Sequence, residues 1–222
     1  MMNEFRWLII SDYFRRDYFF QTISILNFEL RTGYNVDNAH CLHWSRRIEY
    51  PFILSSIPYR CDRVLDIGCA DTPLPFILLS NKVDAIDIDN FFIQSSNNRK
   101  KLLNNDNVEF SCYDASNLPY ENKIFNVVTC VSTMEHMDFN TFKSSLKEIN
   151  RVLVDDGIFL LTIDVVPKTE EYLKYLEKLY GLDTSVGRDT AFMPSTFDLP
   201  YIGIIMMKLD KLEKCFSDNN EL

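Results

Sequence analysis

Short apolar runs alternate with longer amphipathic stretches between about residue 62 and residue 164. This alternation is typical of βαβ units, in which helices join parallel strands. It predicts five strands, at 63–67, 83–88, 108–113, 125–132 and 158–164. The first, second, fourth and fifth runs are almost continuously apolar, as expected of strands that helices cover on both faces.

The stretches between and after these runs predict helices. Thr72 and Pro73 supply an N-cap and a first-turn proline for a short helix. Longer helices are predicted at 91–105 and at 139–153, the second with an apolar residue at every third or fourth position. A further helix at 168–181 has acidic residues early and ends at a glycine, which suits the C′ position of a helix.

A turn and a last strand complete the expected sheet. Asp155, Asp156 and Gly157 predict the turn into the strand at 158–164, and 201–209 predicts a final strand. Together the elements indicate an α/β fold, a three-layer doubly wound sandwich with a mostly parallel seven-stranded sheet. Strand order should reverse near the first strand, and open sheets of this kind bind ligands at such a switch point.

The first sixty residues differ in character from the rest. They are rich in aromatic residues and carry long helical patterns, with little glycine. We therefore expect residues 1–60 to form an N-terminal helical extension or cap, and residues 61–222 to form the α/β domain.

Composition narrows the classes of function. A length of 222 residues with 46% hydrophobic residues suits one domain with a large core. A net charge of -9 argues against nucleic-acid binding, which needs clustered lysine and arginine. No apolar run approaches the roughly 20 residues that cross a bilayer, so no membrane segment is expected. Because none of the six cysteines forms a C-x-x-C pair and the first residues do not resemble a secretory signal, we expect a cytoplasmic protein.

The segment VLDIGCADTPLP, at 64–75, carries the clearest chemical signal. It puts Asp66 and a run of backbone N–H groups at the carboxyl edge of the sheet. Gly68 is required there if a ligand approaches the backbone closely. A tight strand-to-helix turn in another α/β protein could have the same sequence. This segment alone therefore does not distinguish a ligand site from an ordinary turn, and the acids at the ends of the next strands have to be considered.

Two further carboxylates end the next two strands. Asp87 follows Asp66 by 21 positions, the spacing at which a nucleotide-binding βαβ unit places an acid on ribose hydroxyls. Asp114 ends the third strand, so all three acids fall at one edge of the sheet. Buried strand-end acids without a ligand would be costly. Asp84 and Asp89, which lie close to Asp87, are expected to be exposed.

In order along the chain, VLDIGCA, AIDID, YDASNLPY, FNVVTCVSTMEHM and INRVLVDDGIFLLTI resemble the motifs of class I S-adenosylmethionine-dependent methyltransferases. The resemblance covers about 100 residues at the usual spacing and is closest to the broad small-molecule group. It implies a Rossmann-like methyltransferase fold within residues 61–222. It also implies S-adenosylmethionine as cofactor, S-adenosylhomocysteine as product, and a small-molecule acceptor that the sequence does not identify.

The resemblance also implies roles for individual residues. Asp66, Gly68, Cys69 and Ala70 would hold the methionine end of the cofactor. Asp87, with Ile88 beside it, would bind the ribose, while Asp114 and the backbone N–H of Ala115 would meet the adenine. Cys130 and Val131 would line the methionine portion. Ala70 stands where the family usually has glycine, and prolines follow it, so a tighter cofactor loop is expected.

Other candidate groups carry less weight. His136 follows the fourth strand and has a suitable pKa for a general base, although capping the loop is the simpler role. His40, Cys41 and His43 have no complementary ligand cluster, so no metal is predicted. The segment that begins at Arg46 suits an anionic acceptor, but surface ion pairing explains that arginine more simply.

Two other functions stay open at this point. A dinucleotide-dependent oxidoreductase would also place an acid on a ribose, but it needs G-x-G-x-x-G, and the segment here reads G-C-A-D-T-P. A non-catalytic or cofactor-poor binding or assembly module would keep the fold with a weak pocket. Titration with S-adenosylmethionine and with NADH distinguishes the three.

Overall fold

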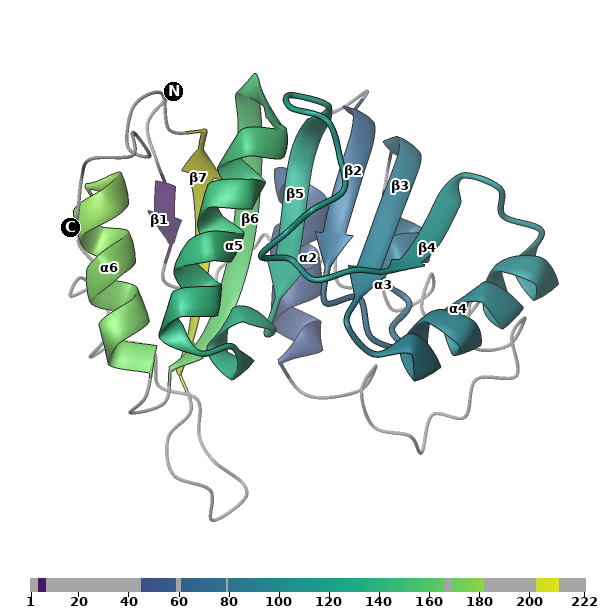
Figure 1. Cartoon of the computed structure of the whole chain (residues 1–222), viewed down its shortest axis with the longest axis horizontal. Coiled ribbons are helices and arrows are strands. Elements are labelled where there is room, and N and C mark those ends of the chain that lie inside the picture. The colour runs from purple at the N-terminus through teal and green to yellow at the C-terminus, as the bar shows by residue number, and fades with distance from the viewer. Residues whose placement is uncertain are drawn as a thin grey trace, which may run out of the picture.

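The computed structural model describes residues 4–6, 45–58, 61–78, 80–165, 169–181 and 203–211. Its centre is a seven-stranded sheet with the order β1-β7-β6-β5-β2-β3-β4 (Figure 1). The strands are β1 (Glu4–Arg6), β2 (Cys61–Ile67), β3 (Ser80–Asp87), β4 (Val108–Cys112), β5 (Phe125–Val131), β6 (Leu153–Val165) and β7 (Gly203–Asp210). Strands β2 to β6 are parallel, and β7 and β1 are antiparallel to their neighbours. The predicted α/β class and mostly parallel sheet are confirmed.

The order of the strands reverses at β2, which pairs with β3 on one side and with β5 on the other. The chain runs outward through β3 and β4 and then returns to β5. The predicted switch point is therefore present between β2 and β5, where the connections that leave the carboxyl ends of the two strands run in opposite directions along the sheet.

Helices cover both faces of the sheet. They are α2 (Arg46–Ser56), α3 (Leu74–Ile77), α4 (Asn90–Leu103), α5 (Phe139–Val152) and α6 (Glu170–Tyr180), with a 3₁₀ turn at Met134–His136. In Figure 1, α5 and α6 lie on the face nearer the viewer, and α2 lies behind the sheet. No helix among the described segments is long and apolar enough to cross a membrane.

Two apolar cores separate the layers. Leu65 and Ile67 of β2 join the core beneath α5 and α6, whereas Val64 joins the core beneath α2 and α3. Successive strand residues point to opposite faces, so one buried strand supplies both cores. This is why β2 reads as a continuous apolar run rather than an alternating one.

The stretch predicted as a turn at Asp155–Gly157 lies inside a strand. β6 already begins at Leu153, which pairs with Phe125, and the next recorded pair joins Ile158 to Val127. Five positions along β6 thus match two along β5, and the turn residues form an irregularity in the ladder. The prediction that the strand begins after this turn was wrong, because Leu153 is buried in the core and already pairs with Phe125 before the irregular stretch.

The short helix after β2 begins later than predicted. Pro73 occupies the N-cap position of α3, and Thr72 instead donates its hydroxyl to the carbonyl of Cys69 at 2.9 Å. Asp84 was wrongly expected to be exposed: it is buried and bonds Arg63 at 2.8 Å and 3.1 Å. Asp89 is exposed, as predicted, and accepts the N–H of Phe91 as the N-cap of α4.

Two described segments fall in the predicted N-terminal helical extension. Residues 46–56 form α2, as the helical pattern predicted, whereas Glu4–Arg6 form a strand that pairs antiparallel with β7. The other residues of the extension lie outside the described residues, and the division at residue 60 stays a prediction.

Candidate functional site

A cavity of about 270 Å³ opens at the carboxyl ends of β2, β3 and β5. Six of the residues predicted for the site line it: Asp66, Gly68, Ala70, Asp87, Val131 and His136. The cavity lies at the switch point of the sheet, where ligands of open α/β folds bind.

The turn after β2 has a backbone that only particular residues tolerate. Gly68 has a φ of +71°, and a Cβ there would lie 2.3 Å from the Thr133 side chain. Ala70 also has a positive φ, of 44°, and its N–H donates to Asp87 at 2.9 Å. Ala70 therefore adopts a left-handed conformation, at a steric cost.

Asp66 lines the cavity and is 2% exposed. Its carboxylate accepts a hydrogen bond from the Thr129 hydroxyl at 2.5 Å. Burial raises the pKa of Asp66 to about 7, and the nearby charge of Asp87 adds to the rise. A cationic group placed in the cavity would favour the ionised form of this acid.

Asp87 ends β3 and shapes the turn as well as facing the cavity. One carboxylate oxygen accepts the N–H of Ala70, and the other accepts the N–H of Asp89, each at 2.9 Å. Each oxygen keeps a further lone pair for another donor.

The other predicted residues do not line the cavity. Cys69 and Cys130 are buried, and Ala115 lies in the core beneath α5. Ile88 is 74% exposed next to Asp87. Asp114 is exposed and accepts two bonds from Ser116 at 2.8 Å. The structure thus brings together two of the three acids, and an adenine contact for Asp114 stays a prediction.

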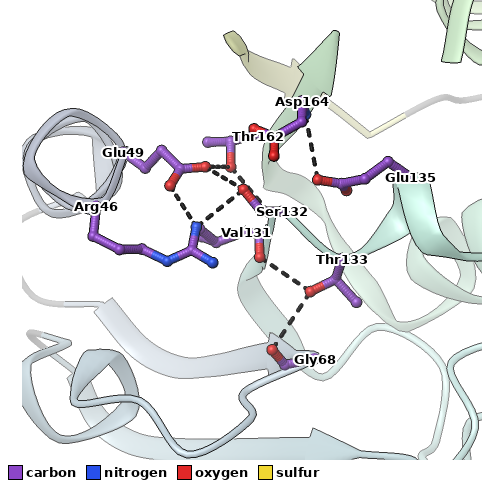
Figure 2. A network of polar contacts seen from close by, with 9 residues as sticks. All are labelled: Arg46, Glu49, Gly68, Val131, Ser132, Thr133, Glu135, Thr162 and Asp164. Atoms are coloured by element: carbon purple, nitrogen blue, oxygen red, sulfur yellow. Dashed lines mark hydrogen bonds and ion pairs between the residues drawn. The ribbon is translucent and has the colours of Figure 1, made fainter. Parts of the chain in front are cut away.

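Sequence reasoning missed a buried polar network beside the cavity (Figure 2). Glu49 is fully buried and forms an ion pair with Arg46. It also accepts bonds from the hydroxyls of Ser132 and Thr162, each at 2.6 Å. The expectation that Arg46 pairs at the surface was wrong, because α2 packs this pair against the ends of β5 and β6. An arginine and a glutamate at i and i+3 were visible in the sequence, but their burial was not.

A second acid of this region, Glu135, is also buried. One of its oxygens accepts the N–H of Asp164 at 3.3 Å, and the other has no hydrogen-bond partner among the described residues. Burial raises the pKa of Glu135 to about 7, and Asp164 contributes to the rise. Its neighbour His136 lines the cavity, and its role as general base stays a prediction.

We expect Glu135→Gln to stabilise the ligand-free protein at pH 8. The raised pKa means that the folded state holds a proton between about pH 4.5 and pH 7 that the unfolded state has lost. Stability falls as pH rises through that window, by about 3 kcal/mol for this group. The glutamine variant should match the wild type at pH 4.5 and exceed it at pH 8 in urea unfolding. Stability curves that run parallel across this range would contradict the assignment.

No group of three or more histidine, cysteine, aspartate or glutamate side chains in the described ranges is placed to hold a metal ion. His40, Cys41 and His43 lie outside these ranges.

Comparison with known proteins finds a match over residues 60–192 to a family described as a methyltransferase domain. The chain is 28% identical over 122 residues to the uncharacterized methyltransferase YcgJ of Bacillus subtilis, and 36% identical over 102 residues to the uncharacterized protein MJ1252 of Methanocaldococcus jannaschii. These matches span 53% and 46% of this chain, and only 47% and 37% of the relatives.

Solved structures with the same fold include the PH0226 protein of Pyrococcus horikoshii, with a TM-score of 0.56 and 18% identity. That match covers 79% of this chain and 94% of the other. Geranyl diphosphate C-methyltransferase of Streptomyces coelicolor also gives a TM-score of 0.56, at 11% identity, over 77% of this chain and 82% of that enzyme. At these identities the likeness concerns the fold alone.

Proposed function

Since the chain belongs to the methyltransferase domain family, we propose that its cavity binds S-adenosylmethionine and that it methylates a small-molecule acceptor. The observation that carries the proposal is that Asp66 and Asp87 line one cavity together with the Gly68 turn. A family resemblance alone would not require the two acids to meet there.

Each wall of the cavity suits one part of the cofactor. The carboxylate of Asp87 can accept two hydrogen bonds from a vicinal diol, as a ribose offers. Ile88 lies outside the cavity lining, but it follows Asp87 directly and exposes an apolar surface on which a purine ring can rest. The absence of a side chain at Gly68 allows the methionine portion to approach the backbone.

Methyl transfer needs little from the protein beyond the alignment of the acceptor with the cofactor. The sulfonium of the cofactor already activates the methyl group, so alignment of the acceptor with the C–S bond would supply much of the rate. The carboxyl groups of Asp66 and Asp87 suit a cationic sulfonium, which would favour the ionised form of Asp66. His136 would remove a proton only if the acceptor were a protonated hydroxyl or amine.

A small-molecule acceptor is supported by the net charge of -9, which disfavours nucleic acid. The acceptor of this chain is a separate matter, because fold alone does not determine a substrate.

We expect Asp87→Ala to weaken S-adenosylmethionine binding tenfold or more, because the loss of a charged hydrogen-bond acceptor costs about 1.5–3 kcal/mol. Isothermal titration calorimetry measures the change. Asp87→Asn keeps an oxygen that can accept the N–H of Ala70, so the turn should stay intact. Its affinity for S-adenosylmethionine should nevertheless be as low as that of Asp87→Ala, which would show that the loss comes from the ribose contact and not from the turn. Asp106→Ala, an exposed acid just before β4, is the control and should bind like the wild type.

The same titrations test the competing functions. Binding of NADH alone would support a nucleotide-dependent oxidoreductase. Binding of neither ligand would support a non-catalytic or cofactor-poor module. Unchanged affinity in Asp87→Ala would remove the ribose assignment.

A further inference from the structure

The turn that follows β2 is bonded to a helix that comes later in the chain. Asp71, the residue after Ala70, accepts a hydrogen bond from Nη2 of Arg99 in α4 at 2.7 Å, and Nη1 is ion-paired with its other oxygen. The hydroxyl of Ser95, one helical turn before Arg99, donates to the same carboxylate at 3.2 Å. The side chains of Arg99 and Asp71 are only 13% and 18% exposed, so water and salt screen this pair less than a surface pair.

The same helix also bonds the backbone of the turn. The hydroxyl of Ser96, which is fully buried, donates to the carbonyl of Ala70 at 3.3 Å. The N–H of Ala70 donates to Asp87, whose other oxygen accepts the N–H of Asp89, the N-cap residue of α4. The turn is thus attached to the start of α4 through Asp87, and to the middle of α4 through Arg99 and the two serines.

The turn needs such attachment because its backbone is strained. Gly68 and Ala70 both have a positive φ, and a non-glycine residue keeps that conformation only where its surroundings hold it there. Gly68, Ala70 and Thr72 all line the cavity. Relaxation of the turn would therefore change the wall that a ligand meets.

We infer that Arg99, acting through Asp71, is a positioning residue that keeps this turn in the conformation to which the cofactor binds. Neither Arg99 nor Asp71 lines the cavity, so the effect reaches the ligand through the turn and not by direct contact. The inference rests on the proposed function. It gives the middle of α4, 28 positions after Asp71, a part in ligand binding.

Calorimetric titration with S-adenosylhomocysteine tests this role. A turn that holds the binding conformation only about a tenth of the time would lower the apparent affinity about tenfold. We therefore expect Arg99→Gln to weaken binding about tenfold. Arg99→Lys keeps the charge without the fork of two donors and should recover part of the loss. Asp71→Asn, which removes the charge of the other partner, should also weaken binding.

Hydrogen exchange separates positioning from a loss of overall stability. The N–H groups of residues 68–70 are bonded to β3, at the carbonyl of Ile86 and the carboxylate of Asp87. In the ligand-free protein, Arg99→Gln should speed exchange at these three groups, and saturating S-adenosylhomocysteine should slow it again. A loss of overall stability alone would speed exchange throughout the sheet.

Arg63→Gln is the matched control, because Arg63 also bonds a buried aspartate, Asp84, through two nitrogens, at the opposite end of β2 from the turn. It should leave both the affinity and the exchange at residues 68–70 unchanged. Wild-type affinity in Arg99→Gln, or faster exchange spread evenly over the sheet, would overturn the inference. A wild-type protein that binds no S-adenosylhomocysteine would instead overturn the proposed function, and this inference with it. If thermal unfolding shows that Arg99→Gln does not fold, Arg99→Lys and Asp71→Asn decide by the same two measurements.

Discussion

Gly68→Ala should lower the free energy of unfolding by about 3 kcal/mol and abolish ligand binding. The added Cβ would lie 2.3 Å from two atoms of the Thr133 side chain and 2.7 Å from its Cβ. Thr133 is short and branched, so it cannot swing aside as a flexible side chain would. The φ of +71° adds the cost of a left-handed conformation. Urea unfolding and cofactor titration measure the two losses.

Two variants separate the causes of that loss. Gly181→Ala places alanine at a φ of +64° with nothing within 4 Å of the new Cβ, so it should cost only about 1 kcal/mol. In a protein that already carries Thr133→Gly, Gly68→Ala should cost less stability than it does in the wild type, because the clash with the Thr133 side chain is gone. If Gly68→Ala proved no more costly than Gly181→Ala, the close approach of the turn to Thr133 would be wrong.

Glu49→Ala should destabilise the protein by about 4 kcal/mol, in the range measured when one partner of a buried ion pair is removed. The side chain of Arg46 is only 15% exposed, so its charge would stay largely buried without a counterion. Ser132 and Thr162 would also lose the acceptor of their hydroxyl groups. Denaturant unfolding at neutral pH measures the effect.

The comparison for this prediction is Glu170→Ala, which breaks an exposed pair with Lys174 and should change stability by about 0.5 kcal/mol or less. Arg46→Met combined with Glu49→Leu replaces the buried pair with apolar groups and should recover most of the loss. A cost for Glu49→Ala as small as that of Glu170→Ala would mean that the network does not hold α2 on the sheet.

The sheet could be predicted because each buried strand is recognisable from its own residues. Strands covered on both faces read as apolar runs, and acids at the ends of β2 and β3 must meet at one edge once these strands are parallel. Asp66 and Asp87 therefore came together as expected. The irregularity at Asp155–Gly157 could not be predicted in this way, since turn residues look the same inside a bulged strand as between two elements.

The buried charges that the sequence analysis missed depend on contacts between residues far apart in the chain. Arg46 and Glu49 lie 86 and 83 positions before Ser132, and nothing local shows that α2 buries them. Asp84 was mistaken for an exposed residue because its partner, Arg63, belongs to the neighbouring strand. Both cases involve a charge whose burial depends on a partner from another element, which a single stretch of sequence does not reveal.

A crystal structure of the protein with S-adenosylhomocysteine tests the central claim most directly. The account predicts the ligand in the cavity at the ends of β2, β3 and β5, with the ribose hydroxyls within hydrogen-bond distance of Asp87 and the sulfur near Gly68 and Val131. A ligand bound elsewhere, or a cavity that excludes the ligand while the protein stays folded, would contradict it.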